Sequence, residues 1–246
     1  MQYLARTKKG EYYFDDKFMF VKTGDEVLKL ALFDGNYYKL RMFKGVPILE
    51  IDGLRMHLVK EFKTPLDYSK EVVKALRSET PDARHKTKHE TRNWKLNTVL
   101  DTCMGLGYTA IQASSSCANV TTCEISNAVM ELAKWNPWSS ELFENENIEI
   151  IQGDIAEEIK DMPECSFNAI IHDPPRFSKA ENLYSFEFYK ELFRVLKIGG
   201  RLFHYVGSPG KGKGRKINEE VKKRLKKAGF RKIRYEAKLQ GILACR

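Results

Sequence analysis

The stretch that decides the fold is VLDTCMGLGYTAIQA, residues 99–113. It begins with a short apolar strand that ends in Asp101, and Gly105 and Gly107 follow before a helix expected from about Thr109. Because glycine has no Cβ, its backbone can turn tightly and approach a ligand closely. A strand, a glycine-containing turn and a helix in this order predict a ligand-binding loop at the edge of a sheet.

Strands and helices alternate downstream of this loop. Helices are predicted at about residues 109–115, 126–135, 185–196 and 218–228, and strands at 98–101, 120–124, 148–151, 167–171, 201–206, 230–236 and 241–245. Alternation of this kind predicts an α/β fold, in which a largely parallel sheet carries helices on both faces.

The first 61 residues read differently, as a β-rich N-terminal module. Apolar and aromatic runs are separated by turn candidates at 23–25, 34–36 and 52–53, which predicts one small antiparallel sheet. A helix is expected to start near Pro65, and the basic stretch around His85 and His89 is expected to be a linker or loop. The predicted domains are therefore 1–61 and 62–246.

Charge is distributed unevenly along the 246 residues. The net charge of +9 divides into +6 over residues 1–97 (20 basic, 14 acidic), −10 over 98–196 (6 and 16) and +13 over 197–246 (16 and 3). Basic flanks around an acidic centre favour a polyanionic partner such as RNA, although a solvated lysine-rich surface gives the same totals.

Five cysteines without a C-x-x-C pair argue against a disulfide framework or structural zinc and favour a reducing, cytoplasmic setting. No metal is expected, because no His, Cys and Asp cluster has ligand spacing. We also expect no membrane-spanning helix and no signal peptide. The oligomeric state is left open.

Carboxylates end three successive strands, at Asp101, Glu124 and Asp154. In an open parallel sheet these ends meet at one edge, where ligands bind. A glycine loop beside a carboxylate, without the third dinucleotide glycine, suits a cationic ligand better than a pyrophosphate. S-adenosylmethionine offers an ammonium tail for Asp101, ribose hydroxyls for Glu124 and an adenine N6 for Asp154. The alternative is that these residues are helix caps.

Four segments carry a resemblance to a known family: VLDTCMGLGYTAIQA (99–113), TTCEIS (121–126), IEIIQGDIAE (148–157) and NAIIHDPPRFS (168–178). From about Pro65 to Tyr235 the chain resembles a class I S-adenosylmethionine-dependent methyltransferase. The resemblance implies a Rossmann-like seven-stranded sheet and a cofactor site at Asp101, Cys103, Gly105, Gly107, Glu124, Asp154 and Ile155. More narrowly, HDPPRFS and the following segment resemble an archaeal family that modifies cytosine N4 in ribosomal RNA.

The segment Asp173-Pro174-Pro175-Arg176-Phe177 is the candidate catalytic site. The lone pair of an exocyclic base amine is delocalised into the ring, so a carboxylate or carbonyl that accepts its N–H makes the nitrogen more nucleophilic. The prolines fix the direction of the Pro174 carbonyl. The resembled pattern has an aromatic residue directly after the prolines, whereas Arg176 stands there and Phe177 follows, so either side chain could hold the base. The alternative is a Pro-Pro turn without chemistry.

Methylation at cytosine C5 would need a thiolate, and HDPPRFS contains no cysteine, so nitrogen is the favoured target. The basic segment 207–216 nearly matches a P-loop, but Gly214 stands where Ser or Thr would be needed. We interpret it as a phosphate-binding loop, with Lys211, Lys213, Arg215 and Lys216 as RNA-binding residues, against the alternative of a simple surface loop.

The predicted function is methyl transfer from S-adenosylmethionine to a base amine of structured RNA, with cytosine N4 of ribosomal RNA favoured. The alternatives are a tRNA or protein methyltransferase, an aminopropyltransferase, and a non-catalytic RNA-binding factor that keeps the fold.

Overall fold

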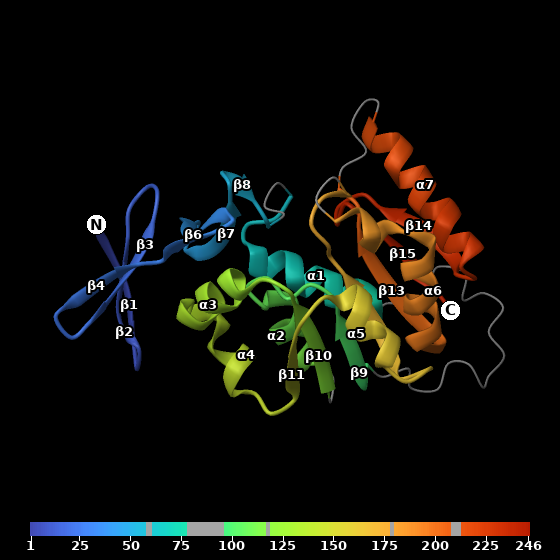
Figure 1. The fold of residues 1–246 in the computed structure, drawn as a ribbon, viewed down its shortest axis with the longest axis horizontal. Coiled ribbons are helices and arrows are strands. Elements are labelled where there is room, and N and C mark those ends of the chain that lie inside the picture. The colour runs from blue at the N-terminus through green and yellow to red at the C-terminus, as the bar shows by residue number, and fades with distance from the viewer. Residues whose placement is uncertain (58–60, 78–95, 117–118, 178–179, 208–212) are drawn as a thin grey trace.

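The structure is a computed structural model that describes residues 1–57, 61–77, 96–116, 119–177, 180–207 and 213–246. Its elements extend along one long axis, with the N-terminal strands at one end and helix α7 (Lys213–Lys227) at the other (Figure 1). Within the described residues, no helix combines the length and the apolar character needed to cross a bilayer. The predicted linker around His85 and His89 lies outside the described residues.

A seven-stranded sheet forms the centre of the described structure, in the order β11-β10-β9-β12-β13-β15-β14. Only β15 runs antiparallel to its neighbours. The chain order reverses beside β9, so the carboxyl ends of β9 and β12 meet at the topological switch point, where ligands bind in such sheets. The strand bounds are β9 (Thr98–Asp101), β10 (Asn119–Glu124), β11 (Ile148–Gln152), β12 (Phe167–His172), β13 (Leu196–Tyr205), β14 (Arg231–Glu236) and β15 (Gly241–Cys245).

Helices cover both faces of this sheet, as predicted. Successive strand residues point to opposite faces, so Val99 belongs to one hydrophobic cluster and Leu100 to the other. The first cluster includes side chains of α1 (Pro65–Arg77), α2 (Tyr108–Ser114), α3 (Asn127–Trp135) and α4 (Ser140–Glu144). The second includes side chains of α5 (Ile155–Asp161), α6 (Phe186–Val195) and α7.

The N-terminal module contains two four-stranded antiparallel sheets, so the prediction of one sheet was wrong. Leu30 lies between them: its N–H donates to Met19 and its carbonyl accepts from Leu40. The first sheet has β1 (Gln2–Thr7), β2 (Gly10–Phe14), β3 (Met19–Thr23) and β4 (Glu26–Lys29), and the second has β5 (Ala31–Asp34), β6 (Asn36–Phe43), β7 (Val46–Ile51) and β8 (Leu54–Arg55). All three predicted turns fall between paired strands.

The module and the central sheet share the first hydrophobic cluster, which runs from Tyr12 and Leu40 to Val72. A polar contact reinforces this packing, because the hydroxyl of Tyr108, at the start of α2, donates to the carbonyl of Pro47 in β7 at 2.8 Å. The module is thereby bonded directly to the helix that follows the glycine turn.

Two boundaries in the C-terminal part differ from prediction. Strand β13 begins at Leu196, where the helix was expected to end, and pairs with β12 through a register shift. Helix α7 begins at Lys213 rather than Asn218, so part of the predicted 207–216 loop is helical. Gly214 disfavours a helix by itself, but the downstream face of α7 is anchored by Val221 and Leu225 in the second cluster.

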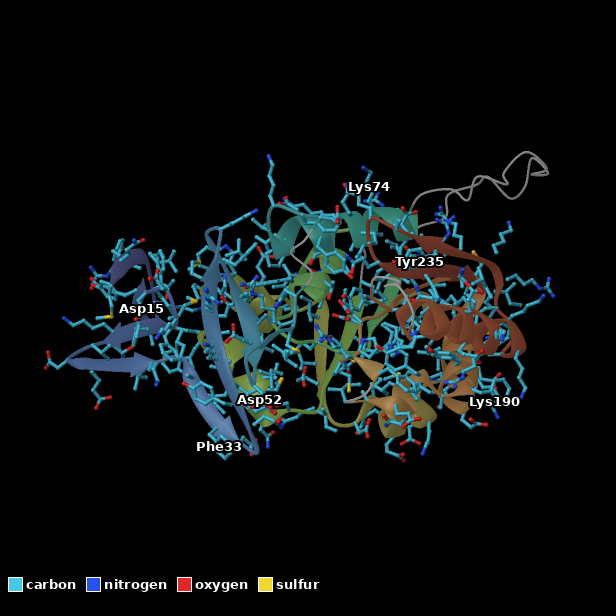
Figure 2. The ribbon with its side chains drawn as sticks, turned by 90° about the horizontal axis from the view of Figure 1, so that it is seen from above. Asp15, Phe33, Asp52, Lys74, Lys190 and Tyr235 are labelled. Atoms are coloured by element: carbon cyan, nitrogen blue, oxygen red, sulfur yellow. The ribbon has the colours of Figure 1, made fainter. Side chains whose placement is uncertain are left out.

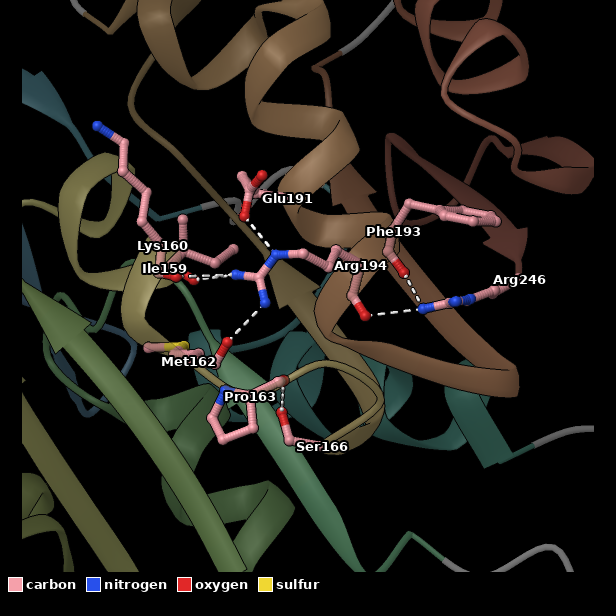
Figure 3. A network of polar contacts seen from close by, with 9 residues as sticks. All are labelled: Ile159, Lys160, Met162, Pro163, Ser166, Glu191, Phe193, Arg194 and Arg246. Carbon is pink, nitrogen blue, oxygen red and sulfur yellow. Dashed lines mark hydrogen bonds and ion pairs between the residues drawn. The ribbon is translucent and has the colours of Figure 1, made fainter.

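Two arginines satisfy carbonyl groups near the carboxyl ends of α5 and α6 (Figure 3). The guanidinium of Arg194 donates to the carbonyls of Ile159 and Met162, each at 2.7 Å, and pairs with Glu191 at 2.6 Å. Arg246 donates to the carbonyls of Phe193, Arg194 and Leu196 at 2.6–2.8 Å. Since the last carbonyls of a helix have no partner within the helix, these contacts replace missing bonds.

We expect Arg194→Ala to lower the free energy of unfolding by about 1–3 kcal/mol, because partly buried carbonyls would lose their donors. Urea denaturation measures this loss. Lys160→Ala is the matched control: its pair with Glu157 is exposed, so its loss should be within about 1 kcal/mol. Equal losses in the two variants would contradict a capping role for Arg194.

Candidate active site

The turn after β9 needs glycine at one position for a clear steric reason. Gly107 has a φ of 76°, and a Cβ there would lie 2.5 Å from the side chain of Leu142. Gly105 also has a positive φ, 56°, with open space around it. The turn therefore leads into α2 by a path that a side chain at Gly107 would block.

Asp101 is fully buried at the end of β9. Its Oδ2 accepts from the hydroxyls of Thr109 at 2.9 Å and Thr122 at 3.3 Å, while its Oδ1 has no hydrogen-bond partner among the described residues. Burial raises the pKa of Asp101 to about 8, and the nearby Asp173 adds to the rise. A buried carboxyl with one free oxygen fits a cationic ligand group, which would hold it ionised.

Glu124 ends β10 and Asp154 lies two residues after β11, and the two carboxylates differ in their partners. Glu124 accepts the backbone N–H of Gly105 at 3.0 Å and of Ser126 at 2.9 Å, so it borders the glycine turn. Burial raises its pKa. Asp154 caps α5 by accepting from Ala156 at 2.9 Å, so the helix-cap alternative holds for one of its oxygens.

Asp173 follows β12 directly and is half-buried. The hydroxyl of Tyr68, on α1, donates to its Oδ2 at 3.5 Å. Burial raises the pKa of Asp173 to about 7, and this carboxylate in turn contributes to the raised pKa of Tyr184 and to the pKa of about 12 at Tyr205. Asp173 therefore has one hydrogen-bonded tyrosine, Tyr68, and lies near enough to Tyr184 and Tyr205 to raise the pKa of each.

The segment after Asp173 is held in place by contacts with Tyr184. Tyr184 donates to the carbonyl of Pro175 at 3.0 Å, and Phe177 packs edge-on against the Tyr184 ring at 5.4 Å between centroids. Pro174 is buried and Arg176 is exposed. Phe177 is therefore partly committed to packing, whereas Arg176 is available to a ligand.

His172 bridges Thr102, at the start of the glycine turn, and Leu183, which lies beyond the Asp173 segment. Its Nε2 lies 3.0 Å from the carbonyl of Leu183 and its Nδ1 lies 2.7 Å from the hydroxyl of Thr102. Since a carbonyl only accepts, Nε2 carries the proton and Nδ1 accepts from Thr102. Burial lowers the pKa of His172 to about 3, and that of His204 is also lowered. Both histidines are therefore neutral structural groups rather than general bases at neutral pH.

Cys103 lies in the glycine turn, half-buried near three carboxyl groups. Burial raises the pKa of its thiol well above the ordinary value, and Glu124, Asp101 and Asp173 add to the effect. The thiol therefore stays protonated and is a poor nucleophile. Cys165 precedes β12 and so lies at the opposite edge of the sheet.

The structure brings together most of the predicted residues. Asp101, Glu124, Cys103 and the two turn glycines border one edge of the sheet, and Asp173 lies close enough to affect the pKa of Asp101. Ile155 is different, because it is buried in the second cluster. Lys211 lies outside the described residues, and the structure describes only the backbone of Lys213, Arg215 and Lys216, in α7. No group of three or more His, Cys, Asp or Glu in the described part is arranged to hold a metal ion.

The sequence interpretation missed the hydroxyl groups near the two carboxylates, which belong to Thr109 and Thr122 at Asp101 and to Tyr68, Tyr184 and Tyr205 near Asp173. Tyr68 had a detectable signal. It lies on the buried face of α1, which is apolar apart from Ser69, and a buried phenol usually has a polar partner.

The raised pKa of Asp101 and Asp173 predicts a pH-dependent stability. In the folded protein these carboxyls keep protons that the unfolded chain releases near pH 4, so their stabilising effect is full below pH 4 and is lost as pH rises through about 7 to 8. The buried histidines act in the opposite sense, but only below their unfolded pKa of about 6.5.

Between pH 6.5 and 8.5 we therefore expect the free energy of unfolding of the ligand-free protein to fall by at most about 1.4 kcal/mol per pH unit for each carboxyl. The melting temperature should fall with it. In Asp101→Asn the fall should be shallower. Differential scanning calorimetry checks both, and a variant with the same slope as wild type would contradict the raised pKa of Asp101.

Comparison with known proteins agrees with this geometry. Residues 99–200 match a family model described as a methyltransferase domain. An uncharacterized protein of Methanocaldococcus jannaschii is 46% identical over 226 residues, which is 92% of this chain and 72% of that protein.

Solved structures share the fold at low sequence identity. A spermidine synthase in complex with the transition-state analogue AdoDATO has a TM-score of 0.68 at 18% identity, over all of this chain and 83% of that one. Spermidine synthase from Thermotoga maritima gives 0.61 at 17% identity, over 93% and 73%. A protein of Methanococcus maripaludis described as a candidate S-adenosyl-L-methionine-dependent methyltransferase gives 0.50 at 16% identity, over 74% and 85%.

The family match starts at β9 and spans the glycine turn, Glu124 and Asp173, the same residues that form the candidate site. The free oxygen of Asp101 fits the cationic tail of the cofactor that this family uses. The chain therefore carries a methyltransferase domain over residues 99–200, its cofactor is S-adenosylmethionine, and it belongs to one family with the M. jannaschii protein.

Proposed function

We propose that this methyltransferase acts on the exocyclic amine of a base in structured RNA, with cytosine N4 of ribosomal RNA as the favoured target. The observation that carries the proposal is the position of Asp173. This carboxylate lies at the carboxyl end of β12, beside the β9 turn, and is near enough to Asp101 to raise its pKa. It therefore borders the place where the cofactor's methyl group would be presented.

The chemistry of an amine target suits this carboxylate. The bound cofactor supplies an electrophilic methyl group, and the amine must supply the electron pair. Asp173, with a pKa of about 7, is ionised in a large fraction of molecules at neutral pH and can accept one amine N–H. The Pro174 carbonyl can accept the other, because the hydrogen bond from Tyr184 to Pro175 fixes the neighbouring peptide. Both contacts push the nitrogen lone pair toward the methyl group.

A carbon target is disfavoured by the state of the nearest thiol. Cys103 is close to the site, but its pKa is raised by burial and by three carboxylates. C5 methylation of cytosine needs a thiolate to add to the ring, so a protonated thiol at this position favours the amine.

RNA as the partner is supported by charge. The net charge of +13 over residues 197–246 includes the basic helix α7, whose last turn carries Arg224, Lys226 and Lys227. Phosphate contacts of this kind position a nucleic acid without reading its sequence. A tRNA, a protein substrate, or a purely RNA-binding role would use the same surface, and the assay below separates them.

One observation favours a second candidate, aminopropyl transfer. The likeness to a spermidine synthase covers the whole chain, N-terminal module included. At 18% identity this likeness shows the fold alone. The strongly basic flanks also oppose a polyamine substrate, because polyamines are cations.

A two-arm assay tests the proposal. The first arm incubates the protein with S-adenosylmethionine and either ribosomal RNA or tRNA lacking modifications, followed by nucleoside mass spectrometry. The second supplies decarboxylated cofactor and putrescine. We expect N4-methylated cytidine from ribosomal RNA and no spermidine. Spermidine formation, methylation of tRNA alone, or cofactor binding without any methylated nucleoside would each overturn the proposal.

A further inference from the structure

The two faces of the second N-terminal sheet differ in composition, because one is largely apolar and the other carries Lys39, Arg41 and Arg55. Tyr38, Leu40 and Leu49 lie in the first hydrophobic cluster. Directly opposed residues in an antiparallel pair share a face, and neighbours along a strand alternate. The register therefore places a different set on the other face, which we call the outer face: Phe33, Tyr37, Lys39, Arg41, Phe43 and Arg55, together with Ala31, Val46, Ile48 and Glu50. Val46, Ile48 and Glu50 are buried, so the accessible part of this face includes the exposed Phe33 and Arg55 and the half-buried Arg41 and Phe43.

Aromatic rings and cations adjoin one another at the outer face. Lys44 and Arg55 lie 5.3 Å and 5.7 Å from the centre of the Phe43 ring. Lys39 lies 5.0 Å from the ring of Phe18, which belongs to the segment before β3. Phe33, on the neighbouring strand, is 75% exposed, although a side chain of this size gains from burial.

The outer face is also positively charged. Its acidic member, Glu50, is buried and paired with Lys39 at 2.8 Å and with Arg41 at 3.8 Å. The other two acidic residues between β5 and β8, Asp34 and Asp52, lie at one end of the sheet. There Asp52 accepts the backbone N–H of Tyr37, and Figure 2 shows Asp52 and Phe33 at this end.

We propose that the outer face binds a single-stranded segment of the RNA substrate, with bases stacked on Phe43 and Phe33 and phosphates bound by Arg41 and Arg55. The proposal rests on the proposed function for the identity of the partner. The exposed ring of Phe33 and the half-buried ring of Phe43 can give a sequence-tolerant stacking surface, and interleaved cations track a phosphate backbone. From Tyr37, opposite Phe33, to Phe43 is six residues along β6, or about 20 Å, which is room for several nucleotides.

The position of the sheet connects this surface to catalysis. Its core face is bonded to the start of α2 through Pro47 and Tyr108, and the ring of His57 lies 5.4 Å from that of Tyr108. Helix α2 follows the glycine turn, so RNA on the outer face is held by the same packed unit that holds the cofactor. The N-terminal module would then give the enzyme a grip on RNA outside the catalytic pocket.

Fluorescence anisotropy with a labelled 12-nucleotide single-stranded RNA tests the proposal, using the full-length protein. We expect Phe43→Ala to bind about five- to a hundredfold more weakly, and Phe43→Tyr, which keeps a stacking ring, to bind like wild type. Arg55→Gln should flatten the log–log salt dependence by about 0.7. Unchanged affinity for S-adenosylmethionine shows that each variant is folded.

The matched control is the double variant Lys134→Gln and Lys160→Gln, which removes two exposed charges, each paired with a glutamate of its own helix. If this control variant loses as much RNA affinity as the outer-face variants, binding depends only on overall charge and the proposal is overturned. So would wild-type binding by Phe43→Ala and Arg55→Gln. Sedimentation velocity tests whether the outer face instead joins two copies of the chain. If the wild type is a dimer and Phe33→Ala is a monomer with unchanged RNA binding, the face is a dimer interface and the proposal is overturned.

The two proposals fail separately. Methylation of ribosomal RNA by wild type, together with outer-face variants that bind RNA normally, overturns this inference alone. Weaker binding by those variants, in a protein that methylates no nucleoside, overturns the proposed function alone.

Discussion

Asp173→Ala should reduce the rate of methyl transfer about 10²- to 10³-fold while cofactor binding stays close to wild type. Loss of one hydrogen bond that stabilises the developing charge of a transition state typically has this effect. Asp173 is placed for such a role because it directly follows β12 beside the glycine turn, with Tyr68 donating to its Oδ2 at 3.5 Å. Single-turnover kinetics at saturating cofactor isolate the chemical step from binding.

Asp173→Asn serves as the matched control, because its amide keeps one acceptor oxygen. We expect it to retain more activity than Asp173→Ala. If Asp173 were only a structural residue, both variants would lose stability and keep their rate. Turnover of Asp173→Ala within a few-fold of wild type would contradict the role that we propose for this carboxylate.

Glu124→Ala should weaken cofactor binding about 100-fold. Each hydrogen bond to a charged group contributes roughly 1.5–3 kcal/mol, and a carboxylate at this strand end can accept from both ribose hydroxyls. The variant would also leave the N–H groups of Gly105 and Ser126 without their acceptor, which loosens the turn. Isothermal titration calorimetry with S-adenosylmethionine measures the change.

Glu124→Gln separates the two causes. Glutamine can still accept one of the backbone N–H groups, but it lacks the charge that strengthens bonds to hydroxyls. An affinity between those of wild type and Glu124→Ala is therefore expected. Equal affinity in wild type and Glu124→Ala would remove Glu124 from the cofactor site.

The central sheet could be predicted well from the sequence because each strand has its own signal. The apolar run before Asp101 gave bounds for β9 that the structure reproduces, and the run before Gly153 gave β11 to within one residue. Helix α1 begins at Pro65 as expected, and Thr64 with Asp67 forms reciprocal capping bonds at its start. In these elements local propensity and tertiary packing agree.

The N-terminal module could not be predicted to the same depth. Turn residues predict which strands form hairpins, but not where one sheet stops and another starts. That division occurs at Leu30, whose backbone bonds to Met19 on one side and to Leu40 on the other. Nothing about a single leucine in an apolar run signals such a junction.

The candidate site shows the same contrast. Asp101, Glu124 and Asp173 were predictable because each lies at or directly after the carboxyl end of one of three parallel strands. The tyrosine that contacts Asp173 was not, because Tyr68 is 105 residues away along the chain, and only packing of α1 on the sheet brings the two together. Likewise, the raised pKa of Asp101 depends on burial and on Asp173, which belong to the assembled fold.

The central claim is that the methyl group goes to a base amine in RNA. Nucleoside mass spectrometry of ribosomal RNA from a strain that lacks the gene, beside the same strain carrying the wild-type gene or the Asp173→Ala variant, tests it most directly. We expect N4-methylated cytidine to be absent from the deletion strain, to return with the wild-type gene and not to return with the variant. An unchanged nucleoside profile in the deletion strain would contradict this claim.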